Sequence, residues 1–426
     1  MSAAPAGASR ARKHVLVVGA GVVGLSTAYY AARAGHRVTV FDRAGAGERG
    51  CSFGNAGLVV PSHFVPLAAP GMVARGLRYM ADRESPFYVR PRLSAELLGW
   101  GFRFWRASNA AHVARSAPLL RDLHVASLAC FEDWAAAWGD DFGLTRHGLL
   151  MLCHTRGGLE EEIHAAEQAH RLGLAAEVLD RAALEALEPG LTMDVAGGVR
   201  YPGDCHLDPG RLMAALAHQV QELGVSLQRE TEVLGWRRNG ERVSAVCTPQ
   251  GEQTADEFVL CGGAWSSQLA RGLGLKVPLQ AGKGYSLTLP QPSRLPRHGA
   301  ILSEARVAVT PMGSALRFGG TLELAGLDRS IDPVRVNGIV RSVLRYYPAF
   351  PAEELRVPAW CGLRPCSPDG LPYLGRFRRY ANLSAATGHA MMGVSLGPIS
   401  GKLMAEILSD GPPSLDITPL RPDRYE

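Results

Sequence analysis

The chain has 426 residues, of which 46% are hydrophobic and 20% are charged. This is the composition of an ordinary globular protein that is long enough for two or three domains. The formal net charge is +5, and because Lys and Arg form no dense block, we expect no nucleic-acid partner. The 8 cysteines include no C-x-x-C pair, which favours scattered reduced thiols over disulfides or an iron–sulfur cluster.

Neither a leader nor a membrane span is expected near the N-terminus. Residues 1–13 are rich in Ala, Gly and Ser, and no apolar run precedes a cleavage site, which argues against a secretory signal. The uncharged stretch 15–32 is long enough to imitate a membrane span. Gly19, Gly21 and Gly24 interrupt it, so a strand, a turn and a helix describe it better. We therefore expect a cytoplasmic protein.

A βαβ unit opens the chain. Residues 14–18 form a short β-branched run that is typical of a buried strand, 25–33 indicate a helix, and 37–41 indicate a second strand. Gly35 is suited to end the helix.

The turn inside this unit has the pattern G-x-G-x-x-G. Gly19 permits the tight turn, Gly21 lets a diphosphate approach the backbone, and Gly24 lets the helix pack on the strand. The N-terminus of the helix offers free N–H groups to an anion. Asp42 ends the second strand and can accept hydrogen bonds from ribose hydroxyls. A dinucleotide site is favoured over the alternative of a glycine-rich packing turn.

Strands and helices alternate along the rest of the chain. Asp208 and Pro209 form an N-cap and first-turn pair, which opens a helix that ends near Gly224. Further helices are predicted over 117–138 and 398–408, and strands over 147–153, 225–228, 243–247, 257–261, 285–289 and 315–318. Pro398 is placed in the first turn of the last helix. Nucleotide-type signals at both ends of the chain predict two interleaved domains.

Four later segments carry a family resemblance. They are the small-residue loop Cys51–Gly57, the turn Gly262–Trp265, the run Gly362–Pro365 with the following Ser367–Pro372, and the loop Thr387–His389 with Gly393 and Gly397. With the first turn, their order resembles the D-amino acid oxidase superfamily of FAD-dependent oxidoreductases. The most similar subgroup is that of the bacterial D-amino acid dehydrogenases, including those that act on D-hydroxyproline. This family usually has Glu where the chain has Asp42, which is shorter but chemically equivalent.

The resemblance implies an α/β fold with a doubly wound, Rossmann-type FAD domain and a substrate domain built on a mainly antiparallel sheet. We expect the FAD domain to comprise 13–65, 205–270 and 360–415, and the substrate domain 66–204 and 271–359. The residues expected to contact FAD are Gly19, Gly21, Val22, Val23, Gly24, Asp42, Arg43, Ser52, Asn55, Ala56, Gly57, Leu58, Val233, Gly262, Gly263, Trp265, Gly388, His389, Met391, Met392, Gly393 and Val394.

Arg364 is the predicted anchor for a substrate carboxylate. A guanidinium offers paired donors and keeps its charge, and the resemblance favours this role over a structural ion pair. Tyr285 is a second candidate for the carboxylate, although a core aromatic residue fits the strand equally well. His63 and His389 are candidates for contact with flavin or substrate, with a hydrogen-bonded buried histidine as the alternative. Lys283 is a further basic candidate for the carboxylate, with a solvated turn residue as an equal alternative.

Two further features can each be interpreted in two ways. Cys361 and Cys366 lie in the neighbourhood where sarcosine oxidases attach the flavin to a cysteine, but they are interpreted here as packing residues. The segment 97–105 gathers four aromatic residues around Arg103. It predicts a helix packed on the flavin domain, with a peripheral contact to the inner face of the cell membrane as the alternative.

The resemblance implies oxidation of a D-amino acid, or of D-proline or D-hydroxyproline, by transfer of hydride from Cα to flavin N5. The electron acceptor is expected to be a quinone or an electron-transfer protein. No metal is expected, because no His/Cys/Asp cluster has ligand spacing. The alternatives are a glycine or sarcosine-type oxidase that uses oxygen, and a non-catalytic flavin subunit that relays electrons.

Overall fold

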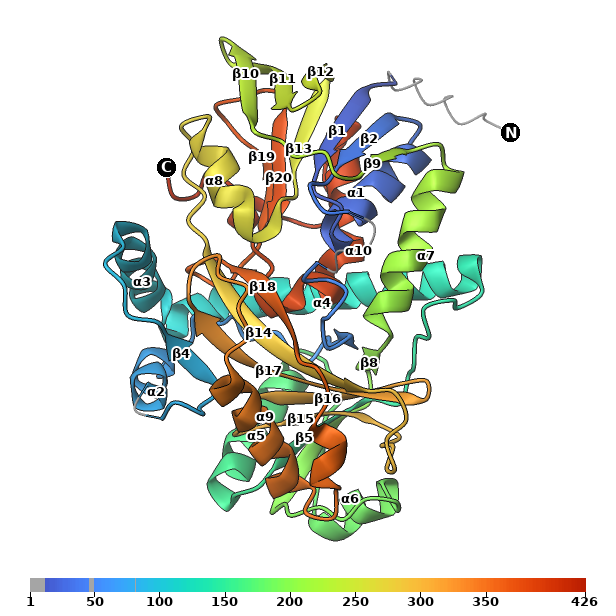
Figure 1. Ribbon diagram of the computed structural model, residues 1–426, viewed down its shortest axis with the longest axis vertical. Coiled ribbons are helices and arrows are strands. Elements are labelled where there is room, and N and C mark those ends of the chain that lie inside the picture. The colour runs from blue at the N-terminus through green and yellow to red at the C-terminus, as the bar shows by residue number, and fades with distance from the viewer. Residues whose placement is uncertain (1–11, 46–49, 81) are drawn as a thin grey trace.

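The computed structural model describes residues 12–45, 50–80 and 82–426. The N-terminal segment considered for a secretory signal lies almost entirely outside these residues. Two sheets lie one above the other in Figure 1, and the long helix α4 (Ala110–Trp138) crosses the middle of the molecule between them.

The first sheet has six strands in the order β19-β20-β13-β1-β2-β9, and all neighbours except β19 and β20 are parallel. The strands are β1 (His14–Val18), β2 (Arg37–Phe41), β9 (Ser226–Gln228), β13 (Glu257–Leu260), β19 (Tyr373–Arg376) and β20 (Leu383–Thr387). One face packs on α1 (Val22–Arg33), α7 (Pro209–Glu222) and α10 (Gly393–Leu408). The other packs on α8 (Ser266–Arg271) and on a small sheet of β10 (Gly235–Asn239), β11 (Arg242–Thr248) and β12 (Gly251–Thr254). The predicted Rossmann-type domain is confirmed.

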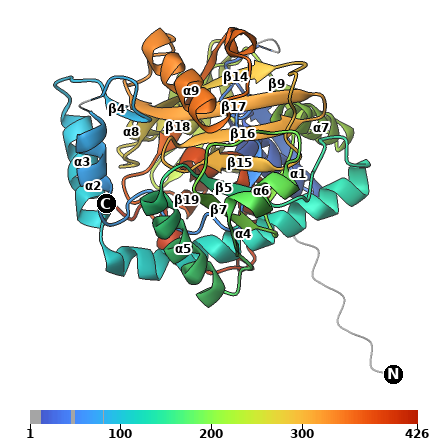
Figure 2. The ribbon, with the colours of Figure 1, turned by 90° about the horizontal axis from the view of Figure 1, so that it is seen from below.

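The second sheet has nine strands, and most of its neighbours are antiparallel, as predicted. Its strands are, in spatial order, β18 (Trp360–Cys366), β14 (Gln280–Leu289), β17 (Ala315–Leu324), β16 (Val307–Met312), β15 (Gly299–Leu302), β5 (Leu149–Cys153), β7 (Gly197–Tyr201) and β6 (Glu177–Leu179), with β4 (Phe87–Val89) beside β17. Figure 2 shows α9 (Pro333–Tyr346) against one face of this sheet.

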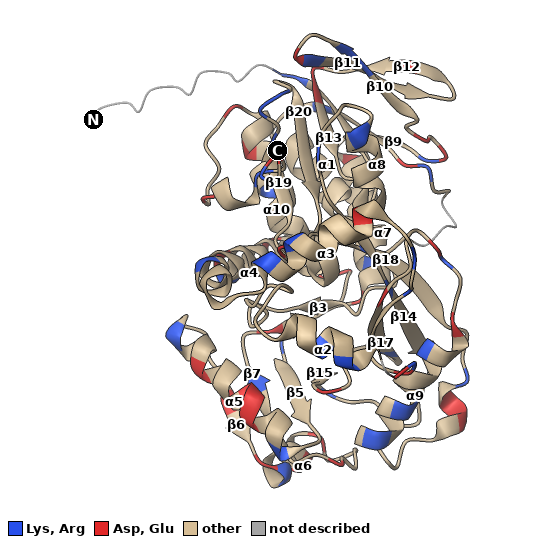
Figure 3. Ribbon diagram, turned by 90° about the vertical axis from the view of Figure 1, so that its left-hand side faces the viewer, with Lys and Arg blue, Asp and Glu red and all other residues tan. Residues whose placement is uncertain are grey.

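Shorter elements surround the two sheets. They are α2 (Met72–Tyr79), α3 (Ala95–Ala107), α5 (Arg156–Arg171), α6 (Arg181–Leu187), the two-stranded pair β3 (Leu58–Val59) and β8 (Cys205–His206), and 3-10 turns at 263–265, 352–355, 390–392 and 418–420. In the described parts of the chain, no helix has both the length and the apolar character needed to cross a membrane. Lys and Arg are interspersed with Asp and Glu on the face seen in Figure 3.

Local signals positioned several elements correctly. The Asp208 carboxylate accepts hydrogen bonds from the N–H groups of Gly210 at 2.8 Å and Arg211 at 3.2 Å, which caps α7. Gly35 follows α1 with a φ of +92°, a left-handed conformation that glycine adopts without strain.

The structure corrects two predictions. β18 pairs with β14 in the second sheet, so residues 360–366 do not belong to the first sheet as the boundary at 360 implied. The last helix begins at Gly393, which places Pro398 inside it. Gly397 faces α1, because a Cβ there would lie 2.9 Å from Cγ2 of Val22. Glycine at this position therefore permits a close contact between α10 and α1.

Candidate active site

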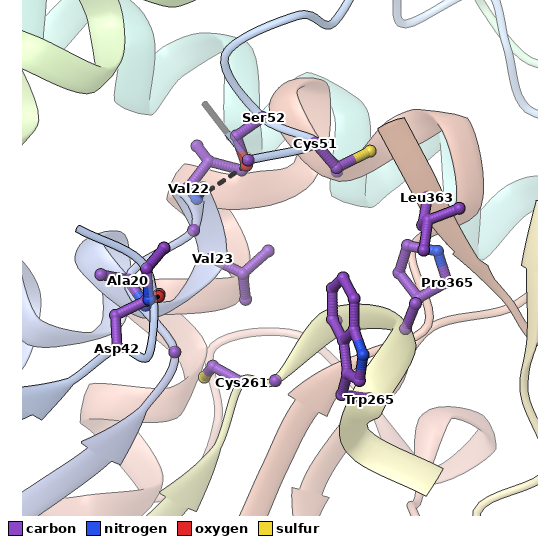
Figure 4. A pocket seen from close by; sticks show the side chains of 18 of the residues that line it. Ala20, Val22, Val23, Asp42, Cys51, Ser52, Cys261, Trp265, Leu363 and Pro365 are labelled. Carbon is purple, nitrogen blue, oxygen red and sulfur yellow. Dashed lines mark hydrogen bonds between the residues drawn. The ribbon is translucent and has the colours of Figure 1, made fainter. Parts of the chain in front are cut away.

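A cavity of about 800 Å³ lies at the carboxyl ends of β1, β2 and β13. This is the end at which open parallel sheets bind ligands. Figure 4 shows it between the turn after β1, the loop around Ser52 and the ring of Trp265. The predicted cofactor residues that line it are Gly19, Gly21, Val22, Val23, Asp42, Arg43, Ser52, Asn55, Val233, Gly262, Gly263, Trp265, His389, Gly393 and Val394.

The three glycines of the first turn serve different purposes. Gly19 has a φ of +112°, and a Cβ there would lie 2.5 Å from the carbonyl oxygen of Cys261. A Cβ on Gly24 would lie 1.9 Å from the carbonyl oxygen of Gly19, so the packing of α1 requires glycine. A Cβ on Gly21 would approach only Oγ of Ser52, at 3.4 Å. Packing within the protein does not require glycine at this position. The open space beside Gly21 is instead suited to a ligand diphosphate.

Hydrogen bonds hold the walls of this cavity together. The Asp42 carboxylate accepts from the N–H groups of Ala20 at 2.6 Å and Ala44 at 2.8 Å. Each carboxylate oxygen retains a further lone pair for a ribose hydroxyl. The Ser52 hydroxyl accepts from the N–H of Val22 at 3.0 Å, across the start of α1.

The other predicted cofactor residues lie elsewhere. Ala56, Leu58, Met391 and Met392 line a second cavity. Gly24, Gly57 and Gly388 line neither cavity and serve close packing instead: a Cβ on Gly57 would lie 2.2 Å from the carbonyl oxygen of Leu207. Sequence reasoning missed several lining residues, among them Cys51, Phe53, Gln268, Leu363 and Pro365. Cys51, Phe53, Leu363 and Pro365 lie in segments that already carried the resemblance.

The second cavity, of about 950 Å³, adjoins the first. Both are lined by Cys51, Asn55, Gly362, His389 and Ala390. The second cavity continues along the nine-stranded sheet to α2 and α3. A small molecule in it would lie beside a ligand in the first cavity.

Arg364 lines the second cavity, and its guanidinium lies against the backbone of Gly284. It donates to the carbonyl oxygen of Thr321. Burial lowers the pKa of Arg364 from its ordinary value. Among the described residues, no carboxylate lies within ion-pair distance of this guanidinium. A buried cation that has no protein counter-ion favours the entry of an anion into the cavity beside it.

Tyr285 does not share this arrangement, which corrects the predicted contact. Tyr285 borders the cavity, but its hydroxyl donates to Glu323 at 2.6 Å. Its ring belongs to the core between α9 and the nine-stranded sheet. Neighbouring residues of a strand point to opposite faces, and Arg364 lies on the face of Gly284.

Lys283 is not a solvated turn residue: it is 1% exposed and pairs with Glu323 at 3.3 Å and Asp328 at 3.1 Å.

The two histidines differ. His63 lines the second cavity, and burial with the charge of Arg306 lowers its pKa to about 4. His389 borders both cavities, but its Nε2 pairs with Oγ of Ser400 at 2.8 Å, so the ring is directed into α10. Burial lowers the pKa of His389 to about 4. Of the two, His63 is the more suitable base for the cavity.

The arrangement agrees with a family model. Residues 14–407 match the DAO family, described as FAD dependent oxidoreductase. The chain belongs to this family of FAD-dependent oxidoreductases. Its relatives include a D-amino acid dehydrogenase of Bradyrhizobium diazoefficiens, 34% identical over 96% of this chain and 98% of the relative. Another of Methylobacterium radiotolerans is 35% identical over 97% and 99%.

Solved structures show the same fold. Glycine oxidase from Geobacillus kaustophilus matches with a TM-score of 0.78 and 23% identity, covering 97% of this chain and 99% of that one. L-proline dehydrogenase from P. horikoshii matches with a TM-score of 0.74 and 19% identity, covering 97% and 98%. These likenesses establish the α/β architecture that the DAO family shares.

The cysteines of this oxidoreductase are all free thiols. The Cys361 thiol donates to the carbonyl oxygen of Arg329 at 3.0 Å, and burial raises its pKa. Burial raises the pKa of Cys366 to about 12. Because the thiolate is the reactive form, these environments favour the interpretation of both as packing residues.

The aromatic helix α3 has an inner and an outer face. Trp100 is buried, stacks on Phe104 with ring centroids 5.1 Å apart, and donates to the carbonyl oxygen of Cys366 at 2.9 Å. In contrast, Leu98, Phe102 and Trp105 are 71%, 59% and 61% exposed. These three side chains line the outer end of the second cavity. The inner face of α3 packs on Leu324 of β17 and Cys366 of β18 in the second sheet, whereas the prediction placed this helix on the flavin domain.

Proposed function

We propose that the protein is a dehydrogenase of free amino acids, with D-amino acids, D-proline or D-hydroxyproline as substrates. The unpaired guanidinium of Arg364 in the second cavity is the observation that supports this most. A carboxylate that enters would complete a charge-assisted pair in a place shielded from water. The relatives from Bradyrhizobium diazoefficiens and Methylobacterium radiotolerans are named D-amino acid dehydrogenases, which supports the D configuration.

The residues of the first cavity would hold FAD. The start of α1 offers N–H groups and a positive dipole end to the diphosphate, and Asp42 accepts from the ribose. When bound, FAD would supply the electron acceptor that takes the hydride from Cα. Arg364 fixes one end of the substrate, so that Cα is presented in one orientation. The apolar wall of the second cavity excludes water until the imine leaves and hydrolyses.

Anaerobic bleaching of the flavin tests this function. The holoenzyme is mixed under nitrogen with a panel of D- and L-amino acids, D-proline, glycine and sarcosine. We expect bleaching by D-amino acids or D-proline and none by their L enantiomers. Fast bleaching by glycine or sarcosine alone would make the protein an amine oxidase of that type. No bleaching by any member, with bleaching by a reduced partner, would make it an electron-relay subunit.

The acceptor is proposed to be a quinone or an electron-transfer protein, with oxygen reacting slowly. The outer end of the second cavity supports an apolar acceptor, because Leu77 of α2 is 67% exposed there beside Leu98 and Trp105. Apolar side chains flanked by arginines on α2 and α3 also suit the surface of an anionic membrane.

Vesicle co-sedimentation tests the membrane contact. We expect the protein to bind vesicles that contain anionic lipid, and the variants Leu98→Asp and Trp105→Asp to bind about tenfold less. Val178→Asp, at a 52% exposed position of β6, is the matched control and should bind as the wild type does. Equal binding by all variants would place the contact elsewhere or exclude it.

A further inference from the structure

Ser62, His63 and Asp204 form a chain of hydrogen-bonded side chains, of which Ser62 and His63 line the second cavity. The Ser62 hydroxyl lies 2.5 Å from Oδ2 of Asp204 and 3.1 Å from Nδ1 of His63. The N–H of Ser62 donates to Oδ1 of Asp204 at 3.0 Å. The pairing of β3 with β8 brings these segments together, since Ser62 follows β3 and Asp204 precedes β8.

The hydrogen bonds among these three side chains determine which nitrogen of the imidazole carries the proton. Asp204 is 1% exposed, and an ionised carboxylate only accepts hydrogen bonds. Ser62 must therefore donate its hydroxyl proton to Asp204. Its contact with His63 then requires that Nδ1 of the imidazole be the donor. Nε2 is left with a lone pair and has no hydrogen-bond partner among the residues described, while His63 lines the cavity that holds Arg364.

We propose that Nε2 of His63 takes a proton from the substrate amino group, and that Asp204 acts through Ser62 as the residue that fixes the required tautomer. An N–H bond of the substrate ammonium breaks, its electron pair remains on nitrogen, and an Nε2–H bond forms. The proton passes to solvent after the product leaves. This inference rests on the proposed oxidation of an amino acid, because only the neutral amine can release electrons toward an imine.

Electrostatics in the cavity agree with this role. Burial and the charge of Arg306 lower the pKa of His63 to about 4, so the imidazole is neutral at pH 7 and its Nε2 lone pair is available. A low pKa also makes a weak base, so the proton transfer requires that the pKa of the bound amine be lowered as well. The same desolvation favours the neutral form of a bound amine over the ammonium. Glu162 also lines the cavity, and burial raises the pKa of its carboxyl, so Glu162 is the competing candidate for the base.

Burial raises the pKa of Asp204 to about 7. Protonation of Asp204 would reverse the direction of the hydrogen bonds through Ser62. When Asp204 is protonated, it donates to Ser62, and Ser62 donates to Nδ1 of His63. Nε2 then carries the hydrogen and cannot act as a base. Activity should therefore rise with pH as Asp204 ionises. The titratable and charged groups facing these two residues are Tyr201 and Cys205 for Asp204, and Arg306 and His124 for His63.

Asp204→Asn tests the inference in the holoenzyme, because the asparagine amide donates to Ser62 permanently. We expect kcat/KM for the best amino acid at pH 8 to fall about 100-fold and the rise near pH 7 to disappear, with unchanged FAD content. Recovery is expected as the pH approaches the amine pKa of the substrate. Glu162→Gln is the matched control and should keep the rise. A wild-type profile for Asp204→Asn, or loss of the rise only in Glu162→Gln, would overturn the proposal.

A second measurement is independent of turnover. In protein labelled with ¹⁵N-histidine, the signals that disappear in His63→Gln belong to His63. We expect a protonated Nδ1 in the wild type at pH 8 and a protonated Nε2 in Asp204→Asn. If the asparagine variant does not fold, Ser62→Ala breaks the chain and should also lose the rise near pH 7. The same tautomer in wild type and variant would overturn the inference even if no amino acid were oxidised, which separates its failure from that of the proposed function.

Discussion

The guanidinium of Arg364 lies flat against the Cα of Gly284, where a Cβ would be 2.3 Å from Cζ. The two residues are on adjacent strands, β18 and β14, and the glycine leaves the space that the arginine occupies. The direction of the predicted carboxylate anchor therefore depends on the absence of one methyl group on the neighbouring strand.

Gly284→Ala should displace the guanidinium while FAD remains bound. We expect KM for the best amino acid to rise about tenfold or more, because the paired contact loses its alignment. Steady-state kinetics with measured FAD content check this. Gly235→Ala is the control, since a Cβ at this strand glycine meets no atom within 4 Å. Unchanged kinetics in Gly284→Ala would mean that Arg364 does not hold the substrate.

Arg364→Ala should keep its fold and its FAD but lose amino-acid turnover. Truncation of a buried charge-assisted contact costs about 2–5 kcal/mol, which is roughly a 30- to 4,000-fold loss of kcat/KM. Arg364→Lys should recover only part, because a point charge cannot make the paired contact. Amines without a carboxylate should be insensitive to either change. Wild-type kcat/KM in the alanine variant would refute the assignment.

Gly21→Val should abolish FAD binding without unfolding the protein. The nearest protein atom to a Cβ at this position is Oγ of Ser52 at 3.4 Å, so the larger side chain extends into the cavity where the diphosphate is expected. Flavin absorbance and FAD released on denaturation measure the loss, and circular dichroism follows the fold. Full flavin content in this variant would show that the cofactor approaches another part of the turn.

Acid should destabilise the protein below pH 6.5. Burial lowers the pKa of His124 to about 3 and those of His206 and His389 to about 4. The unfolded chain binds protons at these histidines first, so each contributes a slope of up to about 1.4 kcal/mol per pH unit as pH falls through this window. The raised pKa values of Asp204 and Glu162 act in the opposite direction. The lowered pKa values of His14, His36 and His63 add to the loss of stability in acid. Urea unfolding at pH 7 and pH 5 checks this, and equal stabilities would contradict it.

Local pattern predicted four of the six strands of the first sheet, β1, β2, β9 and β13, but not β19 and β20. The strand, glycine turn and helix from His14 to Arg33, and the N-cap at Asp208, depend on neighbours in sequence, and the structure has them as predicted. The face of the sheet on which Tyr285 or Arg364 lies depends on the pairing of β14 with β18. No local sequence pattern contains this pairing. The Asp204–Ser62 contact was missed for the same reason, since 142 residues separate its partners.

Strand β18 has a consequence for how substrate preference can change. Arg364 is built on a strand, and the chain continues from it directly into β19 of the first sheet. The far wall of the second cavity comes instead from helices and loops such as α2 and α3. If Arg364 holds the substrate carboxylate as proposed, the common part of an amino acid and its side chain are recognised by different parts of the protein. Pocket libraries confined to α2 and α3 should change side-chain selectivity while leaving the carboxylate anchor in register with the cofactor.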